Sequence, residues 1–161
     1  MYIKAVTSFP NVLVWPIHYD LTFEPIFSNF TFEGKERIDV AISKPTDVIS
    51  LHSAELKIKK CQVEYSGKII PSKITLNEKN ETLTIRLASK INKAAQISIE
   101  FTGILNDRLV GFYRSQYADK FGKTKYLATT QFEAADARRA FPCWEDRKST
   151  RLNPSHTDIS R

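Results

Sequence analysis

Two polar side chains on alternate residues, Gln131 and Glu133, are the first candidates for chemistry in this chain. They follow a segment with strand character, Tyr126–Thr130, and alternate residues of a strand project from the same face of a sheet. Strand ends that lead into loops often carry binding residues. Because a carboxylate at such a place can hold a cation or a protonated amine, the pair is a candidate for substrate binding.

The spacing also leaves a structural role for Glu133 open. Its carboxylate can pair with Arg138 or Arg139, or it can stabilise the N-terminus of a short helix that we expect near residues 134–140. The Ala-rich composition, with Asp136 in the first turn, predicts that helix. On spacing alone, the structural role is favoured over substrate binding.

The sequence contains no complete catalytic constellation. His18, His52 and His156 are isolated, and we expect the first two to be surface or structural residues. A hydrolytic zinc site needs at least three converging ligands, commonly with the motif HExxH, and neither this motif nor a glycine-rich phosphate loop or GxSxG is present. Cys61 and Cys143 are too far apart for a CxxC motif, and we expect free thiols. We therefore expect no catalytic residue and no metal ligand.

Length and composition predict one ordinary folded domain. Of the 161 residues, 42% are hydrophobic and 26% are charged, and no run of 18 apolar residues suggests a membrane span. The N-terminal segment reaches Pro10 before any sustained apolar run, so it lacks the pattern of a secretory signal and we expect a cytoplasmic protein. The net charge is +6, but the basic residues are scattered. Scattered charge argues against a nucleic-acid partner.

A period of two dominates the hydrophobic pattern. Apolar and polar residues alternate over short segments rich in β-branched and aromatic residues, which is typical of strands with one buried face. The segments are Tyr19–Phe23, Ile38–Ile42, Leu56–Tyr65 with a bulge at Lys59–Lys60, Lys73–Leu76, Thr82–Leu87, Ile97–Phe101 and Tyr126–Thr130. Turn-forming residues separate them, among them Glu33–Gly34, Lys44–Asp47 and Leu76–Glu81. The pattern predicts an all-β fold with antiparallel pairing, arranged as a sandwich or saddle.

The composition changes after Glu145. Residues 146–161 show no period of 2 or 3.6, which is typical either of a disordered polar tail or of a segment that is not native. The second interpretation is favoured, because the run DRKSTRLN–SH resembles the translation of a common sequencing adapter read through into the gene. We therefore expect one domain over residues 1–145, incomplete at its C-terminal end, with the true protein continuing beyond it.

The segment Thr130–Trp144, TQFEAADARRAFPCW, resembles the signature that closes the N-terminal domain of the aminopeptidase N-type zinc metallopeptidases. Puromycin-sensitive aminopeptidase and the archaeal tricorn-interacting factors belong to this family. Other segments that resemble the family follow in the expected order: Trp15–Leu21, Phe32–Gly34, Ile49–His52 and Gly111–Ser115. The resemblance covers about Pro10 to Trp144. It ends where the adapter-like run begins, with Glu145 in place of the family's Asp.

The resemblance implies roles for both candidate residues. In the family this domain is a β-rich saddle packed on a catalytic domain, and its edge forms one wall of the active-site cleft. The carboxylate that matches Glu133 binds the free α-amino group of a peptide substrate, and the residue that matches Gln131 lines the pocket for the first side chain. Asp136, Arg138 and Arg139 then fix the loop through ion pairs.

The family's zinc ligands, its general base in HExxH, its transition-state Tyr and its GAMEN loop all lie downstream of this segment. The full-length parent that the resemblance implies is a zinc aminopeptidase, in which a zinc-bound water attacks the first peptide bond. We expect this chain to bind no zinc and to be inactive alone. The missing catalytic domain would leave an exposed apolar face near Phe141–Trp144. The alternative is a free-standing β-sandwich binding module, which would leave no such face.

Overall fold

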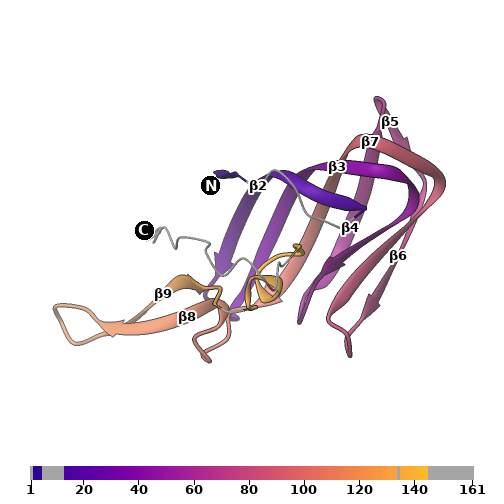
Figure 1. Cartoon of the computed structure of the whole chain (residues 1–161). Coiled ribbons are helices and arrows are strands. Elements are labelled where there is room, and N and C mark those ends of the chain that lie inside the picture. The colour runs from indigo at the N-terminus through magenta and orange to yellow at the C-terminus, as the bar shows by residue number, and fades with distance from the viewer. Residues whose placement is uncertain (1, 5–12, 134, 145–161) are drawn as a thin grey trace.

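The computed structural model describes residues 2–4, 13–133 and 135–144, and most of them lie in strands (Figure 1). The strands are β1 (Tyr2–Lys4), β2 (Val14–Ile26), β3 (Thr31–His52), β4 (Lys57–Tyr65), β5 (Lys68–Ile70), β6 (Ser72–Asn77), β7 (Thr82–Ile104), β8 (Gly111–Ala118) and β9 (Thr124–Gln131). One short 3₁₀ helix, η1 at Ala137–Arg139, is the only helix in this described part. The expected all-β class is confirmed. Residues 146–161, which we expect not to be native, lie outside the described residues.

Seven strands form one antiparallel sheet in the order β1-β2-β3-β7-β4-β5, and β6 pairs with β7 outside this path. The remaining two strands, β8 and β9, form a separate antiparallel hairpin. In Figure 1 this hairpin projects from the body of the domain, with the C-terminal end of β9 returning to it. The returning end carries Gln131.

The two longest strands bend together, and the sheet curls as a result. The first part of β3, Thr31–Ile42, pairs with Lys93–Ile104 of β7, and its last part, Val48–His52, pairs with Thr82–Arg86. Register shifts between these parts mark the bend, and Figure 1 shows both ribbons arching over at the same place. As a consequence β4 and β6, which pair with opposite ends of β7, come into contact.

The curled sheet encloses one hydrophobic core. The side chains of this core come from the alternate apolar positions that the sequence predicts to be buried. Ile38 and Val40 of β3 and Ile97 and Ile99 of β7 are at most 1% exposed, whereas the residues between them are less buried. The largest side chains with less than 2% exposure are Phe32, Phe101, Ile38, Ile49, Leu51, Leu83, Ile85, Ile91, Ile97, Ile99, Leu105 and Val40. Burial of this apolar area is the main favourable term in folding the domain.

Two local predictions are confirmed. The pairing of β4 with β7 shifts register between Ile58 and Lys60, where we expected a bulge. β6 and β7 form the expected hairpin, with Asn77 opposite Thr82.

Two predicted turns, Glu33–Gly34 and Lys44–Asp47, are wrong, because both lie within β3. Lys44–Asp47 forms the bend of that strand. Gly34 serves close packing: it is the register partner of Phe101, and a Cβ atom at this position would overlap the phenyl ring. Gly103 has the same relation to Phe32 on the same pair of strands. Glycine in a strand can mark such close approach as well as a turn.

Candidate functional site

Gln131 and Glu133 lie where the hairpin returns to the body of the domain, and both are exposed. Gln131 is the last residue of β9 and pairs with Gly111, the first residue of β8. Phe132, between them, is half-buried and packs edge-on against Phe141, with ring centroids 5.8 Å apart. The inward Phe132 anchors this point of the chain while its two polar neighbours remain open to solvent.

The turn that carries Glu133 is closed by backbone hydrogen bonds. The N–H of Asp136 donates to the carbonyl of Phe132 at 3.2 Å, and the N–H of Arg139 donates to the carbonyl of Asp136 at 3.1 Å. The N–H of Ala54, next to the end of β3, donates to the carbonyl of Arg138. These bonds fix the turn to the sheet.

Arg139 binds three carboxylates and ties the turn to two distant parts of the chain. Its Nε donates to Asp136 at 3.0 Å, and its two terminal nitrogens donate to Glu55 at 2.6 Å and to Glu81 at 3.1 Å. Arg138, which is 9% exposed, donates to the second oxygen of Glu81 at 3.0 Å. Burial lowers the pKa of Arg139, but the hydrogen bond to Asp136 and the charges of Glu55 and Glu81 outweigh it and raise the pKa. We call Arg138, Arg139, Asp136, Glu55 and Glu81 the arginine cluster.

The contacts of the arginine cluster and the start of the 3₁₀ helix test the two structural roles considered for Glu133. None of the ion pairs formed among residues 2–4, 13–133 and 135–144 includes Glu133, and Arg139 binds other carboxylates. The 3₁₀ helix begins at Ala137, and no acidic residue lies in its first turn. The expected pairing of Glu133 with an arginine and its helix-capping role are therefore both wrong, and the carboxylate stays exposed.

The predicted helix over 134–140 is also shorter than expected. Three residues, Ala137–Arg139, form a 3₁₀ turn, and Ala134 lies outside the described residues. The physical reason is the packing of the residues after this turn, because the chain must run inward at once to bury Ala140 and Phe141. The expected ion pairing of Asp136, Arg138 and Arg139 is confirmed, because Arg139 pairs with Asp136 and both arginines pair with Glu81.

Phe141–Trp144, the closing segment, is packed against the sheet. Phe141 is 5% exposed and contacts Tyr19 and Phe23 of β2 edge-on, and Cys143 pairs with His52 through two backbone hydrogen bonds. The expected apolar face near Phe141–Trp144 is therefore wrong, because β2 and the end of β3 cover it. The exposed large apolar residues lie elsewhere, mostly in loops and on the β8–β9 hairpin: Leu13, Ile17, Phe27, Ile69, Leu76, Ile104, Leu109, Tyr117, Phe121, Tyr126 and Leu127.

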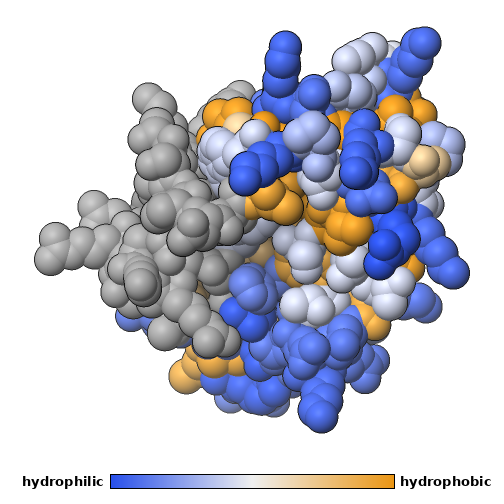
Figure 2. Space-filling model, turned by 45° about the vertical axis from the view of Figure 1, so that its right-hand side comes forward, coloured by the Kyte–Doolittle hydropathy of each residue, from blue (hydrophilic) through white to orange (hydrophobic). Residues whose placement is uncertain are grey.

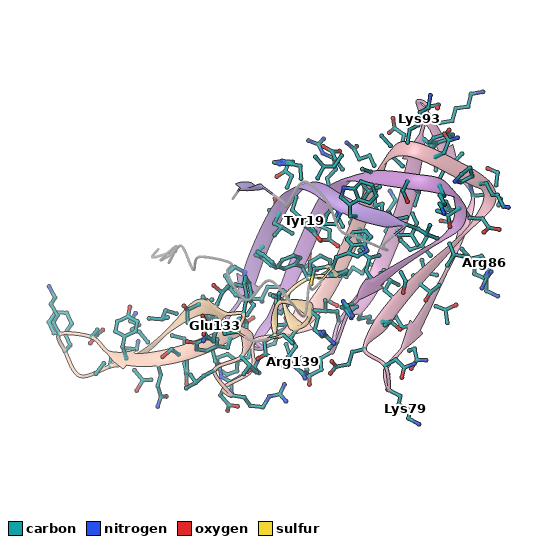
Figure 3. The ribbon with its side chains drawn as sticks, viewed as in Figure 1. Tyr19, Lys79, Arg86, Lys93, Glu133 and Arg139 are labelled. Atoms are coloured by element: carbon teal, nitrogen blue, oxygen red, sulfur yellow. The ribbon has the colours of Figure 1, made fainter. Side chains whose placement is uncertain are left out.

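A groove of about 780 Å³ borders the arginine cluster, with Glu55, Glu81 and Arg139 among its lining residues. Neither Gln131 nor Glu133 lines it. Figure 2 shows apolar patches interrupted by polar side chains on one face of the molecule. Figure 3 shows Glu133 near the end of the hairpin and Arg139 at the turn that follows it. Gln131 and Glu133 thus lie on an exposed surface outside this groove.

The residues present do not fit a zinc site. No three His, Cys, Asp or Glu side chains are grouped for metal binding within the described ranges. Neither Cys61 nor Cys143 is in a disulfide, and burial is the main cause that raises the pKa of Cys61 to about 12. Neither cysteine belongs to a group of potential ligands among the described residues.

Comparison with known proteins identifies the domain. A family model described as the peptidase M1 N-terminal domain matches residues 15–149. This chain belongs to the peptidase M1 family. It is 43% identical over 135 residues to Aminopeptidase 2 of Candida albicans, a match that covers 83% of this chain and 14% of the relative.

Two further relatives also match most of the chain. Aminopeptidase 2, mitochondrial, of Saccharomyces cerevisiae is 42% identical over 139 residues, which cover 83% of this chain and 14% of the relative. Puromycin-sensitive aminopeptidase of Caenorhabditis elegans is 40% identical over 134 residues, which cover 81% of this chain and 14% of the relative. The chain thus spans about one seventh of the length of these relatives, and the resemblance to the aminopeptidase N-type family is confirmed.

The structure adds two residues to the surroundings of the site that the spacing in the sequence does not reveal. Glu55 and Glu81 are 84 and 58 positions from Arg139, respectively, and no motif in the sequence connects them. Gln131 is the last residue of β9 and Glu133 follows two positions later, at the strand end where the sequence places both residues. No helix in the described part of the chain is long and apolar enough to cross a membrane.

Proposed function

We propose that this M1 N-terminal domain is the substrate-anchoring wall of a zinc-dependent aminopeptidase, with Glu133 as the residue that binds the α-ammonium group of a peptide. The observation that carries the proposal is the exposed carboxylate of Glu133, which takes part in no ion pair among the described residues and lies on a turn fixed to the sheet by the arginine cluster. A preorganised carboxylate favours a substrate with a free N-terminus, because binding without an ammonium would leave the carboxylate desolvated and unpaired.

Gln131 lines the pocket for the first side chain of the substrate in this proposal. It is exposed, and it projects beside Glu133 with the inward Phe132 between them. An amide can donate and accept hydrogen bonds, so this residue can contact substrate groups next to the ammonium. The partners are peptides, bound through their free N-termini.

Zinc and its ligands belong to the part of the parent enzyme outside these residues. The names of the relatives support an aminopeptidase parent, and the described residues offer no metal site. We place the protein in the cytoplasm, which agrees with Cys61 and Cys143 not being joined in a disulfide. One relative is named as mitochondrial.

The proposal predicts that catalysis depends on the polypeptide to which this domain is joined. We expect the purified 161-residue chain to bind no zinc stoichiometrically and to leave an aminoacyl 4-nitroanilide intact. We expect a chimera in which residues 15–144 replace the matching segment of the Candida albicans relative to release 4-nitroaniline. Zinc-dependent turnover by the isolated chain would contradict the proposal, and so would a chimera that folds and holds zinc but stays inactive.

The free-standing binding module remains the second candidate function. It is favoured by the burial of Phe141 and Cys143, because the closing segment completes the core without a second domain. The module would fold as a soluble monomer that binds no hydrophobic dye, and its chimera would lack activity. Sedimentation and dye binding on the 161-residue chain test these properties directly.

A further inference from the structure

Glu36 is a carboxylic acid buried in the hydrophobic interior of the sheet. It lies on β3, on the same buried face of the strand as Ile38 and Val40, and it is 4% exposed. Among the described residues, neither of its two carboxylate oxygens has a hydrogen-bond partner. A polar group buried without a partner is costly, and an ionised one is far more so.

The strands on both sides of Glu36 present apolar residues. Leu21 of β2 and Ile99 of β7 are its register partners, and both are buried. Ile99 in turn pairs with Cys61 of β4, so the acid and the thiol lie two strands apart in one row across the sheet. Glu36 thus occupies a position that the pattern of the sheet assigns to an aliphatic side chain.

The titratable groups that share this core carry no compensating charge. They are Tyr19 of β2, Cys61 and Tyr65 of β4, and Cys143 of the closing segment, and side chains of these types are mainly neutral at pH 7. The other buried charged residue of the described part, Arg138, donates to Glu81. Burial raises the pKa of Glu36 well above its ordinary value of 4.5.

Three charged residues lie near Glu36 toward the surface. A small cavity of about 160 Å³ is lined by Glu36 together with Lys35, Lys60 and Glu100. The two lysines are exposed and Glu100 is half-buried, and none of the three supplies a hydrogen bond to the oxygens of Glu36. Burial is accordingly the cause of the raised pKa of Glu36, and no neighbouring cation offsets it.

We propose that Glu36 is a proton-controlled switch of domain stability: the folded chain holds its carboxyl group as the neutral acid, and loss of that proton weakens the core around it. This inference is independent of the proposed function, since it concerns the sheet and not the substrate. It assigns a role to a residue that neither the ion pairs nor the candidate site uses.

The direction of the pH effect follows from proton linkage. The folded state keeps its proton at pH values where the unfolded chain has lost it, so the contribution of Glu36 is most favourable below about pH 4.5. It declines as the pH rises from that value to the pKa of the folded state. In this window the unfolding constant of the wild-type chain rises by about tenfold per pH unit through this one group.

Urea unfolding of the full 161-residue chain between pH 5 and 9 tests the switch. The variant Glu36→Gln has a side chain of nearly the same shape that does not ionise. We expect its stability to increase relative to that of the wild type as the pH rises. Glu64→Gln is the matched control, because Glu64 lies on β4 and is exposed. Its pH profile should run parallel to that of the wild type. Parallel profiles for the wild type and Glu36→Gln would overturn the proposal.

A direct titration covers the case in which Glu36→Gln does not fold. The side-chain carboxyl carbon of Glu36 in the wild-type chain, assigned through its backbone by NMR, should titrate with a midpoint well above 4.5. A midpoint at the ordinary value of 4.5 would overturn the proposal.

Discussion

Replacement of Glu133 by Gln in the chimera should reduce kcat/KM for a free-amine reporter by about 10- to 100-fold, which is the loss of one charge-assisted hydrogen bond of about 1.5–3 kcal/mol. The ammonium group is present in the bound substrate and in the transition state alike, so KM should rise more than kcat falls. Steady-state kinetics on an aminoacyl 4-nitroanilide measure both parameters.

The control for this change is Glu24→Gln, which removes the same charge from an exposed position on β2. Its kinetics should equal those of the unaltered chimera. A reporter with an acetylated amine should be cleaved only at background rates by all three proteins. If Glu133→Gln keeps the full kcat/KM for the free amine, Glu133 is not the amine anchor.

Replacement of Arg139 by Met should destabilise the 161-residue chain by about 2 kcal/mol, because three carboxylates lose their common partner and remain close to one another. Arg139 is the link between the turn of Glu133 and both Glu55 and Glu81. Its side chain is 22% exposed, so solvent replaces the lost contacts only in part. The stability of Arg139→Lys should fall between those of the wild type and Arg139→Met, since a lysine keeps the charge but not the planar fork of donors. The midpoint of urea unfolding gives the difference.

Arg37→Met provides the comparison. The Arg37–Asp20 pair is long, at 3.5 Å, and its side chains are 58% and 48% exposed. Such surface pairs contribute little, so the cost should stay below about 0.5 kcal/mol. Equal losses for Arg37→Met and Arg139→Met would show that the arginine cluster is an ordinary set of surface pairs and does not hold the turn.

The strands could be predicted from the sequence because a half-buried antiparallel strand places its apolar residues at alternate positions. Ile38, Val40, Leu83 and Ile85 are buried as their alternation predicts. The bend of β3 could not be predicted in the same way. Lys44–Asp47 has the composition of a turn, and only the continued pairing with β7 makes it part of one long strand.

The residues of the candidate site also divide into those that local sequence reveals and those that only the fold brings together. Gln131 and Glu133 could be found because their neighbours in sequence are also their neighbours in space. Glu55 and Glu81 could not be found, because the folding of the sheet brings them to Arg139 from far along the chain. The burial of Glu36 could not be predicted either, since a charged residue within an alternating pattern is ordinarily assigned to the exposed face.

We propose that this domain is the N-terminal part of a zinc aminopeptidase, and the source gene tests this proposal most directly. The measurement is the DNA sequence of that gene from codon 140 onward. We predict an open reading frame that continues from Trp144 through Asp-Glu-Pro to GAMEN and HExxH, with residues 146–161 absent from it. A reading frame that encodes residues 146–161 and ends after Arg161 would contradict the claim and leave the binding module as the function of the chain.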